Sequence, residues 1–115
     1  MSALLEDKIV LITGASSGIG RETAKVMAAH GAKIVAAARR ENELAETVKM
    51  IESAGGTATY VVTDISVGSQ VERAIQHAVS TYGGLNAAFN NAGILEIAGH
   101  LHEVDEDDFV KIINV

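Results

Sequence analysis

Short apolar segments alternate with longer amphipathic segments along the chain. The apolar segments are rich in β-branched residues and lie at residues 8–12, 33–37 and 59–63, with a weaker one at 85–89. Continuous apolar strands of this kind are buried on both faces, which is typical of a parallel sheet covered by helices. We therefore predict four parallel strands.

The segments between these strands carry apolar residues at helical spacing. The first helix is predicted from Ile19 to Ala29 and stops at Gly31, where a left-handed helix terminator is expected. Ser66 is the predicted N-cap of the third helix. The apolar stripe of the second helix is Leu44, Val48 and Ile51, and that of the third is Val71, Ala74, Ile75, Ala78, Val79 and Tyr82.

A fourth helix is predicted to begin near Asp105, with Phe109, Ile112 and Ile113 on one side. A cluster of acids precedes or opens it: Glu103, Asp105, Glu106, Asp107 and Asp108. We interpret the cluster as the charged first turn of the helix and keep an acidic partner-binding tail as the alternative.

The alternation of strands and helices predicts an α/β fold with a Rossmann-type, doubly wound parallel sheet. Such a fold usually has two halves, and these 115 residues provide the first half, a fourth strand and the start of the next helix. We therefore expect residues 1–115 to be one segment of a longer, single-domain protein.

Composition excludes several classes of protein. The chain has no Cys and a formal net charge of −6 at pH 7, which fits a reducing cytoplasm and leaves no thiolate for metal binding or catalysis. The longest apolar run, residues 34–38, is far shorter than the ~20 residues that span a bilayer. Few aromatic residues and a negative charge argue against nucleic acid. We expect no membrane and no nucleic-acid partner.

The first predicted strand is followed by TGASSGIG, residues 13–20, which opens the first helix. Its glycines are Gly14, Gly18 and Gly20. Glycine permits a sharp turn, lets backbone N–H groups reach a pyrophosphate and lets helix and strand pack closely, while the helix N-terminus adds partial positive charge. This context favours a dinucleotide site over an ordinary glycine-rich turn.

The same residues also fit the nucleophile elbow of a serine hydrolase, G-x-S-x-G, with Ser16 as nucleophile. Asp64 and then His100 or His102 follow in the required order. An elbow does not explain Gly20, however, and only one strand precedes the loop, so we favour the dinucleotide site.

Arg39 and Arg40 lie about 20 residues beyond the glycines, where an NAD-binding fold usually places an acidic residue. Arg forms charge-assisted bonds to a 2′-phosphate, whereas a carboxylate repels it. The sequence therefore favours NADP over NAD. Glu41 keeps NAD as the alternative.

The chain resembles the short-chain dehydrogenase/reductase family over essentially its whole length, through TGASSGIG, Asp64, the NNAG sequence after the fourth strand and Asn114. The resemblance implies that Ser16, Ser17 and Ile19 contact the pyrophosphate and ribose of the cofactor, and that Arg39 contacts the 2′-phosphate. It further implies that Asp64 and the Ile65 backbone hold the adenine edge. Asn90, Asn91, Ala92 and Gly93 would steady the sheet and line the ribose, and Asn114 would hold a water in a proton relay.

The family's acid–base centre does not match this sequence. It requires a Tyr followed four residues later by Lys, with a Ser upstream, to move a proton while nicotinamide passes a hydride. Here Tyr60 is followed at that distance by Asp64 and Tyr82 by Asn86. We expect these residues beyond Val115.

The resemblance implies an NADP(H)-dependent oxidoreductase acting on a small alcohol or carbonyl substrate, assembled as a homodimer or homotetramer. A dinucleotide-binding sensor without turnover is the alternative. His100, His102 and Asp105 suggest a metal site only weakly, and we predict none.

Overall fold

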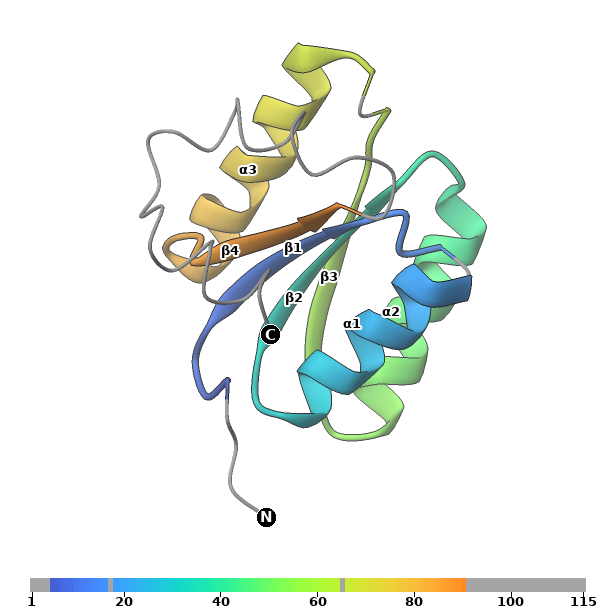
Figure 1. Ribbon diagram of the computed structural model, residues 1–115, viewed down its shortest axis with the longest axis vertical. Coiled ribbons are helices and arrows are strands. Elements are labelled where there is room, and N and C mark those ends of the chain that lie inside the picture. The colour runs from blue at the N-terminus through green and yellow to red at the C-terminus, as the bar shows by residue number, and fades with distance from the viewer. Residues whose placement is uncertain (1–4, 17, 65, 91–115) are drawn as a thin grey trace.

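A computed structural model describes residues 5–16, 18–64 and 66–90. Four parallel strands form one sheet in the order β3-β2-β1-β4 (Figure 1). The strands are β1 (Ile9–Thr13), β2 (Lys33–Ala38), β3 (Thr57–Val62) and β4 (Ala87–Asn90). The α/β fold with a parallel sheet is therefore confirmed, and each strand begins and ends within two residues of its predicted bounds.

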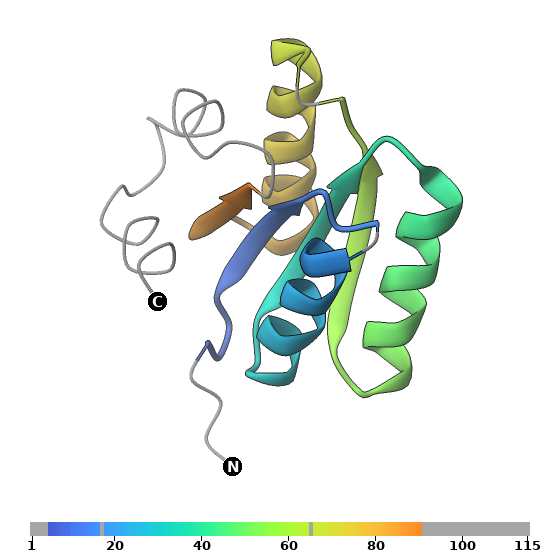
Figure 2. The same cartoon turned by 45° about the vertical axis from the view of Figure 1, so that its right-hand side comes forward.

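Three helices connect the strands: α1 (Gly18–Ala29), α2 (Glu41–Ser53) and α3 (Gly68–Tyr82). Helices α1 and α2 cover one face of the sheet and α3 covers the other, as Figure 2 shows. Because β3 and β4 lie at opposite edges, α3 crosses over β2 and β1 to connect them. The strand order therefore reverses at β1, and β1 and β4 border the point of reversal.

Alternate residues of β1 enter two separate cores, as the two-residue period of a strand requires. Val10 and Ile12 pack with residues of α1 and α2, whereas Ile9 and Leu11 pack with residues of α3. All five residues of β1 are buried. The prediction that this strand is covered on both faces is confirmed.

The third strand was expected to be buried in the same way, and this expectation is wrong. In β3 only Ala58 is buried, and Val62 is 42% exposed. The reason is position, because β3 lies at the edge of the sheet. Val79 of α3 is likewise 43% exposed, so it does not belong to the buried stripe of that helix.

Two predicted helix ends have different outcomes. Gly31 has a φ of 97°, which confirms the left-handed position after α1. Ser66 is not the N-cap of α3, because the helix is preceded by Val67 and the Ser66 hydroxyl donates to Asp64 instead. The predicted fourth helix lies outside the described residues. Within the described ranges, no helix is long and apolar enough to cross a membrane.

Candidate functional site

The loops that follow β1, β2 and β3 all lie at the carboxyl edge of the sheet, the side where the parallel strands end. Two backbone hydrogen bonds tie the loops after β1 and β3 to the last residues of β2. The Ala15 N–H donates to the Ala37 carbonyl at 3.3 Å, and the Thr63 N–H donates to the Ala38 carbonyl at 2.7 Å. Ligands of doubly wound sheets bind at this carboxyl edge, beside the point where the strand order reverses. The predicted glycines, arginines and Asp64 are thus brought to the same edge.

The described part of the glycine loop (residues 14–18, without residue 17) has the backbone that its sequence predicts. Gly14 and Gly18 have φ values of 67° and 56°, a region that residues with side chains adopt at a cost. A Cβ at Gly20 would overlap the Gly14 carbonyl oxygen, so α1 can pack this closely on the loop only because Gly20 lacks a side chain. The predicted roles of glycine in the turn and in close packing are confirmed. The packing also gives Gly20 a function that a nucleophile elbow does not require.

The outer surface of the glycine loop is open and suits an anion. Gly14 and Gly18 are exposed, Ser16 is half-buried, and Ile19 is 69% exposed. Apart from its chain neighbours and the backbone of its own helix, no heavy atom of the described residues lies within 4 Å of the position that a Cβ would occupy at Gly18. Helix α1 begins here and has no acidic residue in its first turn, so its partial positive charge is available to a phosphate.

The inner side of the glycine loop is held by α2, which the sequence did not suggest. The Thr47 hydroxyl donates to the Ala15 carbonyl at 2.8 Å, and the side chain of Thr47 is fully buried. Arg21 of α1 donates from Nε to the Thr47 hydroxyl at 2.8 Å. The sequence did contain one signal of this buried contact: Thr47 is a polar residue within the apolar stripe of the second helix, three residues after Leu44 and four before Ile51.

Arg39 and Arg40 follow β2 and are both exposed. Arg40 occupies the N-cap position of α2 and makes no side-chain capping bond. The charge of Arg39 is a minor cause of the lowered pKa of Asp64. Two exposed cationic side chains therefore lie at the end of β2.

Asp64, after β3, sits in a local hydrogen-bonded turn. Its Oδ1 accepts from the Ser66 hydroxyl at 2.6 Å and from the Ser66 N–H at 3.0 Å. These bonds, followed by the charge of Arg39, lower the pKa of the Asp64 carboxyl. Gln70 of α3 accepts from the Asp64 N–H at 2.8 Å, a second positioning contact that the sequence did not suggest.

Glu41, the residue that keeps NAD as an alternative, opens α2. The Tyr60 hydroxyl of β3 donates to its Oε2 at 3.3 Å. The negative charge of Glu41 is the largest cause that raises the pKa of Tyr60. The carboxylate therefore has a neighbour on β3 but remains exposed.

Several predicted site residues lie outside the described residues: Ser17, Ile65, Asn91, Ala92, Gly93 and Asn114, together with His100 and His102. Asn90 ends β4 and is paired in register with Thr13, which puts its backbone beside the start of the glycine loop. Tyr82 is the last residue of α3, and its ring centroid lies 5.9 Å from the ammonium of Lys33, which begins β2. Tyr82 is therefore on the side of the sheet where the strands begin, far from the carboxyl edge. Burial, followed by the charge of Glu52, raises the pKa of Tyr82.

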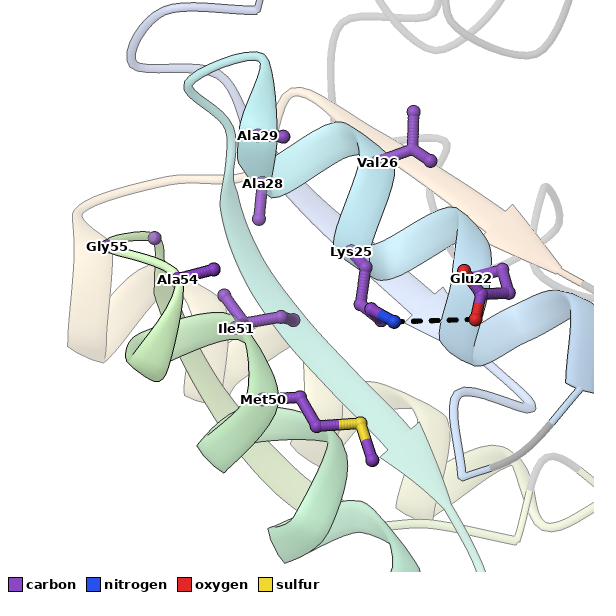
Figure 3. A pocket seen from close by; sticks show the side chains of 10 residues that line it. Glu22, Lys25, Val26, Ala28, Ala29, Met50, Ile51, Ala54 and Gly55 are labelled. Atoms are coloured by element: carbon purple, nitrogen blue, oxygen red, sulfur yellow. Dashed lines mark hydrogen bonds and ion pairs between the residues drawn. The ribbon is translucent and has the colours of Figure 1, made fainter.

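Two hollows lie beside α1. One, of about 390 Å³, opens between α1 and α2, where the Lys25 ammonium lies 3.4 Å from Glu22 Oε1 (Figure 3). Ala29 and Gly55 line this hollow, and they precede β2 and β3 in the chain. The hollow therefore lies where the strands begin, on the opposite side of the sheet from the glycine loop. The other, of about 1020 Å³, runs along α1 from Gly18 to His30 and therefore adjoins the loop.

The sequence profile of the short chain dehydrogenases matches residues 8–115, and the chain belongs to this family. An uncharacterised oxidoreductase of Listeria monocytogenes is 37% identical over 111 residues, which cover 96% of this chain and 44% of the relative. A 3β-hydroxysteroid dehydrogenase of Mediterraneibacter gnavus is 38% identical, over 95% of this chain and 40% of the relative. The chain thus spans less than half the length of these relatives.

A solved short chain dehydrogenase/reductase of Burkholderia phymatum has a similar structure, with a TM-score of 0.71 and 36% identity. The similarity covers 76% of this chain and 31% of that protein, whose crystals contained NAD. The resemblance drawn from the glycine loop, Asp64 and the NNAG sequence is confirmed at the level of the family and the fold.

Proposed function

We propose that the full-length protein is an NADP(H)-dependent oxidoreductase that interconverts a small alcohol and a carbonyl compound. The observation that carries the proposal is the glycine loop, with its two left-handed glycines, its exposed outer face and the N-terminus of α1, whose first turn contains no acidic residue. This arrangement fits a pyrophosphate, and Arg39 stands at the same edge of the sheet. Membership of the short chain dehydrogenase family supports the reaction class.

The residues present fit a nicotinamide dinucleotide. Gly14, Ser16, Ser17, Gly18, Ile19 and Gly20 would hold its pyrophosphate and ribose, Asp64 with Ile65 its adenine, and Asn90, Asn91, Ala92 and Gly93 its second ribose. When bound, the nicotinamide supplies or accepts the hydride. An ionised Asp64 can accept a hydrogen bond from an amino group.

NADP rather than NAD is proposed because Arg39 and Arg40 offer cationic donors at the end of β2. The test is calorimetric titration of the full-length protein with NADPH and NADH. Arg39→Ala should weaken NADPH binding by more than about tenfold and NADH binding little, since the lost bond is charge-assisted. Equal losses for both nucleotides would refute the assignment of the 2′-phosphate.

The proposed acid–base group must come from sequence outside residues 1–115, because neither Tyr60 nor Tyr82 is followed by Lys at the fourth position. Asn114 is proposed to hold a water in the proton relay. We expect residues 1–115 alone to reduce no carbonyl compound, and measured turnover would contradict this. A full-length protein that binds NADPH but lacks a Tyr-x-x-x-Lys sequence would instead be the non-catalytic sensor.

The substrate is proposed to be a small molecule, and the protein a cytoplasmic homodimer or homotetramer. Absence of Cys supports a reducing compartment, and the family supports self-association. Sedimentation of the full-length protein tests the assembly, with a monomer at micromolar concentration as the contradicting result. A panel of ketones and secondary alcohols with NADPH and NADP identifies the substrate class.

A further inference from the structure

We propose that Thr47 of α2, supported by Arg21 of α1, is a positioning residue for nucleotide binding, an inference that rests on the proposed function. Thr47 is fully buried and its hydroxyl donates to the Ala15 carbonyl at 2.8 Å. The hydroxyl thus ties α2 to the inner side of the glycine loop, 32 residues away in sequence. This contact is on the inner side of the loop, away from the open face. Thr47 and Arg21 are therefore proposed to act on the nucleotide site through Ala15.

Ala15 is the anchor of the glycine loop. Its methyl group is fully buried, and its N–H donates to the Ala37 carbonyl at 3.3 Å. The neighbours on either side are freer, since Gly14 is exposed and Ser16 is half-buried. The conformation of the exposed residues is therefore set by how firmly Ala15 is held.

Arg21 directs the Thr47 hydroxyl toward Ala15. The hydroxyl has one hydrogen and two carbonyl acceptors, Ala15 at 2.8 Å and Glu43 at 3.1 Å. The Glu43 carbonyl already accepts from Arg21 Nη2 at 3.0 Å, so the hydroxyl hydrogen is best placed on the Ala15 carbonyl. Donation from Arg21 Nε to the hydroxyl oxygen further polarises the O–H group and strengthens its bond.

Loss of the Thr47 hydroxyl would leave a buried carbonyl without this donor, which is costly. The loop would then populate conformations in which the Ala15 carbonyl turns elsewhere. Binding affinity falls in proportion to the fraction of molecules that keep the competent conformation. The contact therefore stabilises the conformation that receives the nucleotide as well as the fold.

The test compares Thr47→Val, which has nearly the same shape without the hydroxyl, with Thr47→Ser, which keeps the hydroxyl. Calorimetry on the full-length protein should show NADPH binding about tenfold weaker for Thr47→Val, and within about twofold of the wild type for Thr47→Ser. Val35→Ala is the control, because Val35 is buried on the α3 side of the sheet and its loss lowers stability away from the loop. Unchanged affinity in Thr47→Val, or an equal loss in Val35→Ala, would overturn the proposal.

A second measurement needs no nucleotide. Hydrogen exchange of the Ala15 amide should be at least about tenfold faster in Thr47→Val than in the wild type or Thr47→Ser, since opening of the loop governs that exchange. If Thr47→Val does not fold, Arg21→Met is used, with about threefold weaker NADPH binding and faster Ala15 exchange expected; no change in either would overturn the proposal. A wild type that binds no nicotinamide nucleotide refutes the proposed function, whereas unchanged Ala15 exchange refutes the role of Thr47.

Discussion

Gly20, in the first turn of α1, packs directly on the carbonyl oxygen of Gly14, the first residue after β1. A Cβ at position 20 would overlap that oxygen and come within 3.2 Å of the Ala15 Cα. Both partners are backbone, so the overlap can be relieved only by moving the helix or the loop. The approach of α1 to the sheet is therefore fixed by the absence of one methyl group.

Gly20→Ala should destabilise the protein by about 1–3 kcal/mol, the usual cost of overpacking. It should also weaken NADPH binding, because α1 and the glycine loop move apart. Chemical unfolding and calorimetry of the full-length protein measure both effects. Gly84→Ala is the matched control, since Gly84 has no heavy atom within 4 Å of its Cβ position and no positive φ. A Gly20→Ala protein as stable as the control would contradict the packing argument.

Gly18→Ala tests the open face of the glycine loop. Gly18 has a φ of 56°, so the substitution costs about 1–2 kcal/mol of stability even though the space around it is empty. The added methyl group would project into the proposed phosphate site, so NADPH binding should fall by more than about tenfold. Gly55→Ala, at a φ of 90° and equally open, should cost similar stability but leave NADPH binding unchanged. Equal effects of both variants on binding would argue against a phosphate site at Gly18.

The pKa of Asp64 provides a prediction for acidic solution. Ser66 is the main cause that lowers it and Arg39 a smaller one, so Ser66→Ala should raise the pKa more than Arg39→Ala. Because the pKa is lower in the folded state, the ionised carboxylate stabilises the fold above the unfolded value near pH 4, and this contribution is lost as pH falls through the folded value. Ser66→Ala should therefore lose less stability on acidification. Titration of the Asp64 carboxyl by NMR checks the order, and a larger change in Arg39→Ala would contradict it.

Glu41→Gln tests whether the carboxylate of Glu41, the first residue of α2, influences the pKa of Tyr60 and the choice of cofactor. Removal of its charge should lower the pKa of Tyr60 toward the ordinary value, since Glu41 is the largest cause of the rise. It should also strengthen NADPH binding relative to NADH by about two- to threefold, a small effect because exposed charges are screened. Tyr60→Phe removes the hydrogen bond but keeps the carboxylate, and should leave the NADPH-to-NADH ratio unchanged. Phenolate absorbance and calorimetry measure the two effects, and an unchanged ratio in Glu41→Gln would show that Glu41 does not influence the choice of cofactor.

The sequence predicted most of the fold because the periodicity of apolar residues and the spacing of glycines are local patterns. Apolar strands alternating with amphipathic helices specify a parallel sheet, and the spacing of Gly14, Gly18 and Gly20 specifies a tight turn and close helix packing. Ser66 was assigned wrongly because a Ser before a helix can bond either to the helix or to a nearby Asp, and here Asp64 offers the stronger, charged acceptor. Val62 was assigned wrongly because composition does not reveal which strand lies at an edge, and Val79 because helical spacing does not reveal how much of a helix the sheet covers.

By itself, the sequence determined the elements, their order and the chemistry gathered at their ends, because these depend on residues close together in the chain. Only the tertiary structure decided which distant groups support that chemistry. Three hydrogen bonds join distant parts of the chain: from Thr47 to Ala15, from Arg21 to Thr47, and from the Asp64 N–H to Gln70. Each depends on how two elements pack against each other, and that packing is a property of the whole folded core.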